Sequence, residues 1–532
     1  MADHGRGSAR QPKPQHRQQP RFDAKPGASR HQPARNPRGK PGFRADPRIH
    51  SRTPHELDPR KVAHAVLSRL EPGELLDAAV DREMRKQGFD AAQSHRVLAM
   101  LEDAVRFGLL FNALIAHVAT RPPEALDRDV RAALHLFLAW YLIDDPNAVY
   151  AHGQAAVDLL PPDSKSRGFV NACVRRLGEF VRVEMGPRED YRQQSESATA
   201  PQFWREKARL GRGRFVVAKL PVFPDFEKDP AAHLATVCAL PRWFIDQLIE
   251  QHGMQGAVKV ALSAVEEPPT WVRVNKLRGN ANELQSQWQM SGLEIERVGE
   301  ALRLPAHTNV TELPGFGNGA FYVQDLTSQQ IAPALGAKAS EAILDLCAAP
   351  GGKSGHLAEI TGDRARILAC DVSADKIARI HDNVTRMGYT CVSTVMGDAR
   401  SVRFPERFDR VLLDAPCSNS GVLGRRVEAR HRLDAATVTE LARVQMNMLE
   451  NAAFNLMPGG TLVYSVCSIL MEEGVDLVRF FLSARAEAGE PGSKNGGMQR
   501  EEAGWELQEE KIILPTPAYC DGMYWCRLKA PG

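Results

Sequence analysis

The 532-residue sequence lacks several features that would mark a membrane or secreted protein. Its longest apolar stretch, residues 132–143, contains His135 and is too short to cross a bilayer, and there is no apolar core of a secretory signal. Nine cysteines lie far apart without a C-x-x-C pair, so their spacing supports neither a zinc site nor a disulfide framework. No repeat of fixed period is visible. These absences favour a cytoplasmic protein without a metal.

The net charge of +3 conceals an uneven distribution along the chain. Residues 1–52 hold 13 Lys and Arg against 3 Asp and Glu, whereas the remaining residues hold 55 against 62. Residues 1–52 also contain eight prolines and almost no large apolar residues, which predicts that residues 1–54 form a disordered basic tail. Such a charge suits a polyanion, RNA above all, and a purely solubilising extension is the alternative.

The apolar pattern divides the rest of the chain into four segments. Asp58-Pro59 predicts a helix start, and the helical spacing that follows predicts an all-helical domain over residues 55–185. The charged and turn-rich residues 186–239 predict a linker or divergent insertion. Short strands around helices predict a small α+β module over 240–330. Strands that alternate with helices predict an α/β domain with a mostly parallel, doubly wound sheet over 331–532.

A glycine-containing loop follows the first strand of that α/β domain. The run Asp345-Leu346-Cys347-Ala348-Ala349-Pro350-Gly351-Gly352-Lys353 ends where a helix can begin, and its glycines let the backbone approach a ligand. Asp371 ends the next strand 19 residues after Gly352, at the spacing of an acid that bonds ribose hydroxyls. Cys347 stands where a P-loop needs glycine, and G-x-G-x-x-G is absent. An adenosyl ligand without a pyrophosphate remains, most commonly S-adenosylmethionine, with Asp398 near its adenine.

Two cysteines follow two later strands of the predicted sheet, in Asp414-Ala415-Pro416-Cys417-Ser418 and Ser465-Val466-Cys467-Ser468. The carboxyl ends of parallel strands line the ligand crevice, so both thiols should face the methyl donor. A lone cysteine is usually a small buried hydrophobe, but two at strand ends beside a cofactor loop indicate catalysis. Carbon 5 of cytosine becomes reactive when a thiolate adds to carbon 6, whereas a nitrogen needs no such help. Asp414 can bond the cytosine ring nitrogen or amine. The spacing does not say which thiol attacks.

These motifs resemble the Sun (Fmu, RsmB-type) family of bacterial ribosomal RNA cytosine-5 methyltransferases, within the group that includes the nucleolar Nop proteins. The resemblance covers most of residues 55–532 and is most specific over 273–474. Supporting segments outside the catalytic strands are Gly168-Phe169-Val170-Asn171, Arg273-Val274-Asn275, Gln324-Asp325 and Asp521-Gly522-Met523-Tyr524. The resemblance implies a NusB-like helical RNA-binding domain, an RRM-like module and a Rossmann-like class I methyltransferase domain. It also implies that the product is 5-methylcytosine in 16S ribosomal RNA.

The resemblance further assigns the site residues. S-adenosylmethionine would be bound by Cys347, Ala348, Ala349, Pro350, Gly351, Gly352, Lys353, Asp371, Asp398 and Asp414. Cys467 would be the nucleophile and Cys417 would assist release of the methylated base, with Asp414 and Lys353 completing the catalytic set. The chain departs from the family pattern at Asn419-Ser420 (usually Gly-Thr), Val427 (Pro), His431 (Trp), Val466 (Thr) and Gly474 (Asn). None of these departures removes a thiol or a cofactor carboxylate.

Three functions are therefore open. We expect a monomeric, cytoplasmic enzyme that methylates small-subunit ribosomal RNA. A transfer RNA cytosine-5 methyltransferase would carry the same motifs. An RNA-binding or ribosome-assembly factor with vestigial methylation is the third possibility, and the intact set of cofactor acids and cysteines argues against it.

Overall fold

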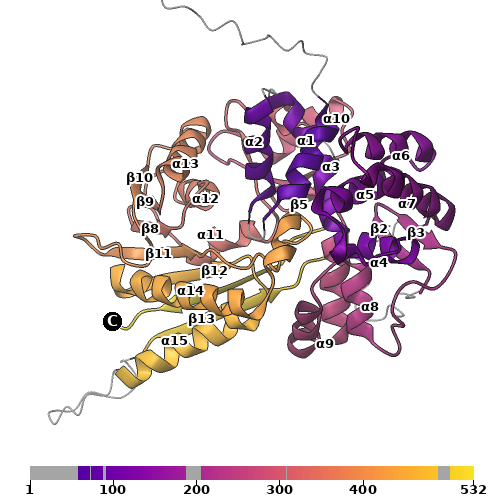
Figure 1. Cartoon of the computed structure of the whole chain (residues 1–532). Coiled ribbons are helices and arrows are strands. Elements are labelled where there is room, and N and C mark those ends of the chain that lie inside the picture. The colour runs from indigo at the N-terminus through magenta and orange to yellow at the C-terminus, as the bar shows by residue number, and fades with distance from the viewer. Residues whose placement is uncertain (1–57, 72–73, 88–90, 187–204, 307, 489–503) are drawn as a thin grey trace, which may run out of the picture. The chain divides into compact units, whose positions relative to one another are not determined.

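Figure 1 presents the chain as a computed structural model, which describes residues 58–71, 74–87, 91–186, 205–306, 308–488 and 504–532. These residues belong to one unit, Leu57–Gly532. The predicted basic tail lies outside the described residues. Within them, no helix combines the length and apolar character needed to span a bilayer.

Helices make up the first part of the unit. They are α1 (Pro59–Arg69), α2 (Leu76–Gln87), α3 (Ala91–Arg106), α4 (Gly108–Val118), α5 (Arg128–Ala139), α6 (Val149–Asp158) and α7 (Ser166–Phe180). The predicted start of α1 is confirmed: the Asp58 carboxylate accepts the Arg60 N–H at 3.0 Å, and Pro59 occupies the first turn. Val62 and Val66 lie on the buried face, in the core that continues through Leu134.

A small sheet follows these helices where the sequence predicted none. Strands β1 (Val181–Met185), β2 (Lys207–Gly211) and β3 (Arg214–Ala218) pair antiparallel in the order β1-β3-β2, and α8 (Pro230–Val237) comes next. Residues 55–185 are thus not all-helical, and the described part of 186–239 is not a plain linker. Sequence reasoning missed the strands because each is only five residues long. Their charged residues also make the sequence look exposed, although Phe215 and Val216 are buried.

The next elements form the predicted small α+β module. They are α9 (Arg242–Val265), β4 (Thr270–Val274), α10 (Ala281–Met290), β5 (Glu296–Val298), β6 (Ala301–Leu304) and β7 (Phe321–Val323). The strands pair antiparallel in the order β5-β6-β4-β7. Trp288 of α10 packs edge-on against Phe321 of β7 with ring centroids 5.0 Å apart, which fixes the helix on the sheet. The short strands and the helices predicted for this part of the chain are therefore confirmed.

The C-terminal part contains a seven-stranded sheet in the order β10-β9-β8-β11-β12-β14-β13. Its elements are α11 (Ile331–Leu335), β8 (Ala342–Leu346), α12 (Gly352–Ile360), β9 (Arg366–Asp371), α13 (Ala374–Met387), β10 (Val392–Met396), β11 (Phe408–Asp414), α14 (Ala435–Asn455), β12 (Leu456–Val466), α15 (Val475–Ala488), β13 (Glu506–Ile513) and β14 (Met523–Lys529). The five neighbouring strands β10, β9, β8, β11 and β12 run parallel to one another. Strand β14 runs antiparallel to both β12 and β13. The mostly parallel sheet is therefore confirmed.

Alternating side chains of the central strands build a core on each face of this sheet. On β8, Ile343 packs into the cluster that contains residues of α11, α12 and α13, whereas Leu344 and Leu346 pack into the cluster with α14 and α15. On β11, Leu412 packs into the first of these clusters and Leu413 packs into the second. Successive side chains of a strand point to opposite faces, so a sheet covered on both sides needs apolar residues at every position. This confirms the doubly wound arrangement.

Candidate active site

The predicted site residues gather at the carboxyl edge of the parallel strands. The chain leaves β8 for β9 on one side, and β11 pairs with the other side of β8, so the strand order reverses there. Ligands of open α/β sheets bind in the crevice at such a reversal. The loop after β8 and the ends of the other parallel strands supply the predicted residues: Cys347–Lys353, Asp371, Asp398, Asp414, Cys417 and Cys467.

The loop after β8 has a backbone that requires glycine. Gly351 has φ +97°, a conformation that side chains disfavour, and a Cβ on Gly352 would lie 2.7 Å from the Tyr322 ring. The loop is held by Asp371, whose Oδ2 accepts the Ala349 N–H at 2.9 Å. Asp371 is itself buried, and Lys376 Nζ lies 3.0 Å from its Oδ1. Asp371 therefore fixes the loop after β8 to the end of β9.

Asp345 is a buried acid that sequence reasoning quoted within the loop run but did not assign to the site. Its Oδ2 accepts the Ser354 hydroxyl at 2.5 Å, and its Oδ1 has no hydrogen-bond partner among the described residues. Burial raises its pKa to about 7. The sequence signal for Asp345 is that it is an acidic residue in a strand whose other residues are apolar.

Asp398 completes the row of acids at this edge. It follows β10, and the neighbouring Gly397 N–H donates to the Asp371 carbonyl at 2.9 Å, so the two strand ends stay together. Hydrogen bonds from Arg400 lower the Asp398 pKa, which keeps it a carboxylate. A glycine loop, acids at adjacent strand ends and the unpaired Asp345 Oδ1 are a donor and acceptor set that fits an adenosyl ligand.

Lys353 and Asp414 form an ion pair beside the loop. The Ser465 hydroxyl donates to Asp414 Oδ1 at 2.7 Å, so β12 orients the carboxylate that ends β11. Burial alone would lower the Lys353 pKa, but Asp414, Asp345 and Cys467 hold it above its usual value. Lys353 is therefore an ammonium at neutral pH, and its charge acts on the Cys467 sulfur.

The two predicted cysteines lie together. Cys417 Sγ and Cys467 Sγ are 3.2 Å apart, and the Cys467 thiol also donates to Asn419 Oδ1 at 3.0 Å. The hydrogen bond with Cys467 and burial raise the Cys417 pKa well above its usual value, so Cys417 stays a thiol. Cys467 is partly exposed whereas Cys417 is buried, which makes Cys467 the more accessible sulfur. All nine cysteines are free.

A buried glutamate anchors the segment that carries Cys417. Glu473 accepts the Ser418 N–H at 2.8 Å and the Ser418 hydroxyl at 2.5 Å, and Gln445 donates to it at 2.9 Å. Ser420 Oγ lies 2.8 Å from Ser468 Oγ, which joins the segments after β11 and β12. Sequence reasoning missed Glu473 and Gln445, because neither residue lies at the end of a strand. These contacts hold the two thiols at a fixed separation.

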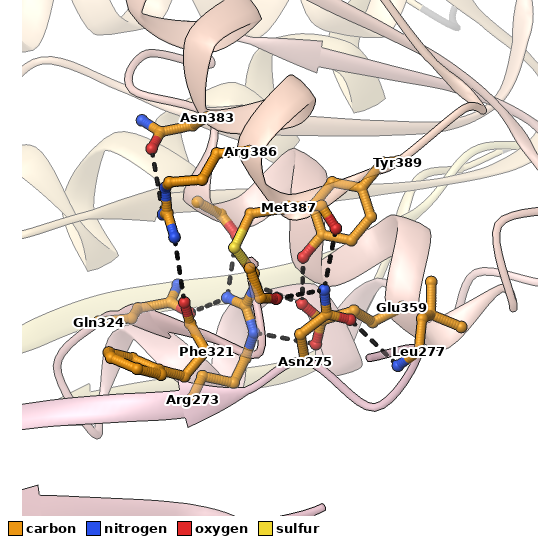
Figure 2. A network of polar contacts seen from close by, with 12 residues as sticks. Arg273, Asn275, Leu277, Phe321, Gln324, Glu359, Asn383, Arg386, Met387 and Tyr389 are labelled. Atoms are coloured by element: carbon orange, nitrogen blue, oxygen red, sulfur yellow. Dashed lines mark hydrogen bonds and ion pairs between the residues drawn. The ribbon is translucent and has the colours of Figure 1, made fainter. Parts of the chain in front are cut away.

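A buried polar network connects the small module to the loop after β8 (Figure 2). Arg273 of β4 pairs with Glu359 of α12 through contacts of 3.1 and 2.8 Å, and both side chains are at most 3% exposed. The same guanidinium donates to the Gly352 carbonyl at 3.0 Å, while the Tyr389 hydroxyl donates to Glu359 at 2.5 Å. Burial and Glu359 raise the Tyr389 pKa, so the phenol keeps its proton. The module thus fixes the first residue of α12.

Comparisons with known proteins agree with these features. A family described as 16S rRNA methyltransferase RsmB/F matches residues 332–529, and a ferredoxin-like domain of RsmF/B-like methyltransferases matches residues 240–311. Ribosomal RNA small subunit methyltransferase B of Sodalis glossinidius is 34% identical over 310 residues, which are 57% of this chain and 67% of that protein.

One further relative and one solved structure extend the comparison. The probable ribosomal RNA small subunit methyltransferase B of Bacillus subtilis is 30% identical over 318 residues, which are 58% of this chain and 71% of that protein. The crystal structure of PH0851 has a TM-score of 0.61 and 24% identity, and the match covers 89% of this chain and 99% of that one. The last is a likeness of fold across the helical, small and catalytic parts.

Proposed function

The chain belongs to the RsmB/F family of 16S rRNA methyltransferases, and we propose that this S-adenosylmethionine-dependent enzyme forms 5-methylcytosine through a bond between Cys467 and carbon 6 of its target base. One observation carries the mechanism: two thiols lie 3.2 Å apart beside the glycine loop, at the ends of adjacent parallel strands. Transfer to a nitrogen would need neither thiol.

The proposed reaction uses the two thiols in order. The Cys467 thiolate adds to carbon 6, and the electron pair of the 5,6 double bond makes carbon 5 nucleophilic. Bound S-adenosylmethionine supplies a methyl group on a positively charged sulfur. Once carbon 5 carries the methyl group, its proton leaves to water, and we assign to the Cys417 thiol, 3.2 Å from Cys467, the role of assisting release of the methylated base. The double bond re-forms and expels Cys467 as a thiolate.

The charged groups around the thiols support this order. The Lys353 ammonium interacts electrostatically with Cys467, so a positive charge lies near the attacking sulfur. We assign to Asp414, which Lys353 and Ser465 orient, the role of accepting a hydrogen bond from the cytosine amine. We assign S-adenosylmethionine binding to the loop Cys347–Lys353 with Asp371, Asp398 and Asp414.

We further propose that RNA binds to a NusB-like domain over residues 55–185 and to an RRM-like module over 240–330, with the basic tail of residues 1–54 adding phosphate contacts. Residues 186–239, which include β2, β3 and α8, would be a divergent insertion between the two, and residues 331–532 would form the catalytic domain. The target base must be unpaired or flipped to reach Cys467. The enzyme would act as a monomer in the cytoplasm.

Bisulfite sequencing of RNA from a deletion strain tests this function. We expect one cytosine in 16S rRNA to lose its protection from conversion, and the wild-type gene should restore it. Loss of protection in a transfer RNA, with 16S rRNA unchanged, would instead identify a transfer RNA enzyme. No change in either RNA, together with a ribosome-assembly defect, would leave a non-catalytic role.

Replacing Cys417 with alanine should trap the enzyme on its substrate. Release fails in this variant while attack by Cys467 continues, so the covalent adduct accumulates. Denaturing gel electrophoresis of the variant with RNA and S-adenosylmethionine should show a band of protein bound to RNA. The Cys417→Ala/Cys467→Ala double variant should show none. An adduct from Cys467→Ala instead would reverse the two roles.

A further inference from the structure

Asn419 contacts both thiols of the site. Its side-chain Oδ1 accepts a hydrogen bond from Cys467 Sγ at 3.0 Å, and its backbone N–H bonds the Cys417 sulfur. Asn419 itself has no assigned role in attack, release or cofactor binding. A residue that contacts both sulfurs can nevertheless govern how each is oriented.

The backbone explains why asparagine can occupy this position. Asn419 has φ +62°, a left-handed conformation that glycine adopts freely and that asparagine tolerates better than most residues. The related family usually has glycine here, which offers no side chain to a neighbouring thiol. A glycine at this position could not make the contact between Asn419 and Cys467.

The segment that carries Asn419 is fixed on both sides. Ser418 is anchored by Glu473, and Ser420 Oγ accepts the Ile469 N–H at 3.0 Å. The Gly421 N–H donates to the Cys467 carbonyl at 3.0 Å. The two backbones therefore cannot separate, and only the two side-chain torsions of Asn419 are left to vary. A hydrogen bond made under these conditions costs little entropy.

We propose that Asn419 is a positioning residue for Cys467, whose thiol hydrogen it holds so that the sulfur points in one direction before attack. The inference rests on the proposed role of Cys467 as the nucleophile. An amide carbonyl accepts hydrogen bonds and cannot donate one, so it stabilises the thiol relative to the thiolate. The other charged and titratable groups near the pair are Lys353 with Asp414, and Cys417 with Glu473 behind it.

Asn419 and Lys353 interact with Cys467 in different ways. The ammonium places a positive charge near the sulfur, while the carbonyl holds the thiol hydrogen and fixes the orientation of the sulfur. Asn419→Gly removes the acceptor without straining the backbone. Asn419→Asp keeps the acceptor in the same place and adds a negative charge, which disfavours the thiolate further. The series Gly, Asn, Asp should therefore order the pH at which Cys467 becomes reactive.

The test is the rate at which iodoacetamide alkylates Cys467 in the full chain as a function of pH, with peptide mapping to separate Cys467 from Cys417. We expect the half-maximal pH to fall by about 1 unit in Asn419→Gly and to rise by a similar amount in Asn419→Asp.

Asn447→Asp is the matched control, because it adds the same charge at an exposed position of α14 and should leave the alkylation curve unchanged. Alkylation curves of Asn419→Gly and Asn419→Asp that coincide with that of the unaltered enzyme would overturn the positioning role, even if thermal stability changes. Methyl transfer by Cys467→Ala would overturn the proposed function instead. The alkylation of Cys467 in the Asn419 series is independent of that result.

Discussion

Replacing Cys467 with alanine should abolish methyl transfer while S-adenosylmethionine binds as tightly as it does to the unaltered enzyme. The side chain is the proposed covalent partner of carbon 6, so its loss removes the step that makes carbon 5 reactive. We expect a fall in kcat of at least about 10³-fold. Transfer of a radiolabelled methyl group to unmodified 16S rRNA measures the first effect, and calorimetric titration with the cofactor measures the second.

Cys391→Ala is a matched control for this variant. Cys391 belongs to the same domain but lies before β10, where its backbone N–H bonds Asp363 at 3.0 Å. Its loss should leave both measurements unchanged. Full activity in Cys467→Ala would exclude Cys467 as the nucleophile. A loss of cofactor affinity equal to the loss of rate would show that Cys467 supports the fold of the site rather than its chemistry.

The residues that could be predicted from sequence lie at the ends of strands. Asp371, Asp414 and Cys467 each follow an apolar run, and parallel strands bring their carboxyl ends to one edge. Their gathering follows from this local pattern and the topology together. Cys417 and Cys467 lie 3.2 Å apart because β11 and β12, the strands that they follow, are neighbours in the sheet.

The supporting residues could not be predicted in this way, because they depend on contacts between distant segments. Arg273 and Glu359 are 86 positions apart, and Ser418 and Glu473 are 55 apart. Neither pair has a spacing that a helix or a strand would impose. A charged residue within an apolar segment was the available signal, and it does not identify the partner.

Asn419 shows a different limit of the sequence. Family resemblance marked it only as a departure from glycine. Its φ of +62° is a left-handed conformation that glycine adopts freely and asparagine tolerates. That its amide would face Cys467 depends on how the segments after β11 and β12 are joined through Ser420 and Ser468. Only the three-dimensional arrangement therefore shows that asparagine at this position adds a contact with Cys467.

Replacing Glu359 with glutamine should destabilise the protein and weaken cofactor binding together. The change keeps the shape of the side chain but leaves the Arg273 guanidinium buried without its counter-charge. Breaking a buried ion pair in this way costs about 3–5 kcal/mol. Because Arg273 also donates to the Gly352 carbonyl, its displacement should loosen the start of α12 and raise the dissociation constant of S-adenosylmethionine. Denaturant unfolding and calorimetric titration measure the two effects.

The double variant Arg273→Met/Glu359→Leu separates these contributions. Replacing both charges with apolar groups removes the uncompensated charge, so most of the lost stability should return. The Gly352 carbonyl still lacks its donor, so cofactor affinity should stay low. Glu406→Gln, which breaks the exposed pair of Arg366 and Glu406 at 2.9 Å, should change neither quantity. Recovery of both stability and affinity in the double variant would mean that Arg273 does not hold the loop. The small module would then contribute only to stability.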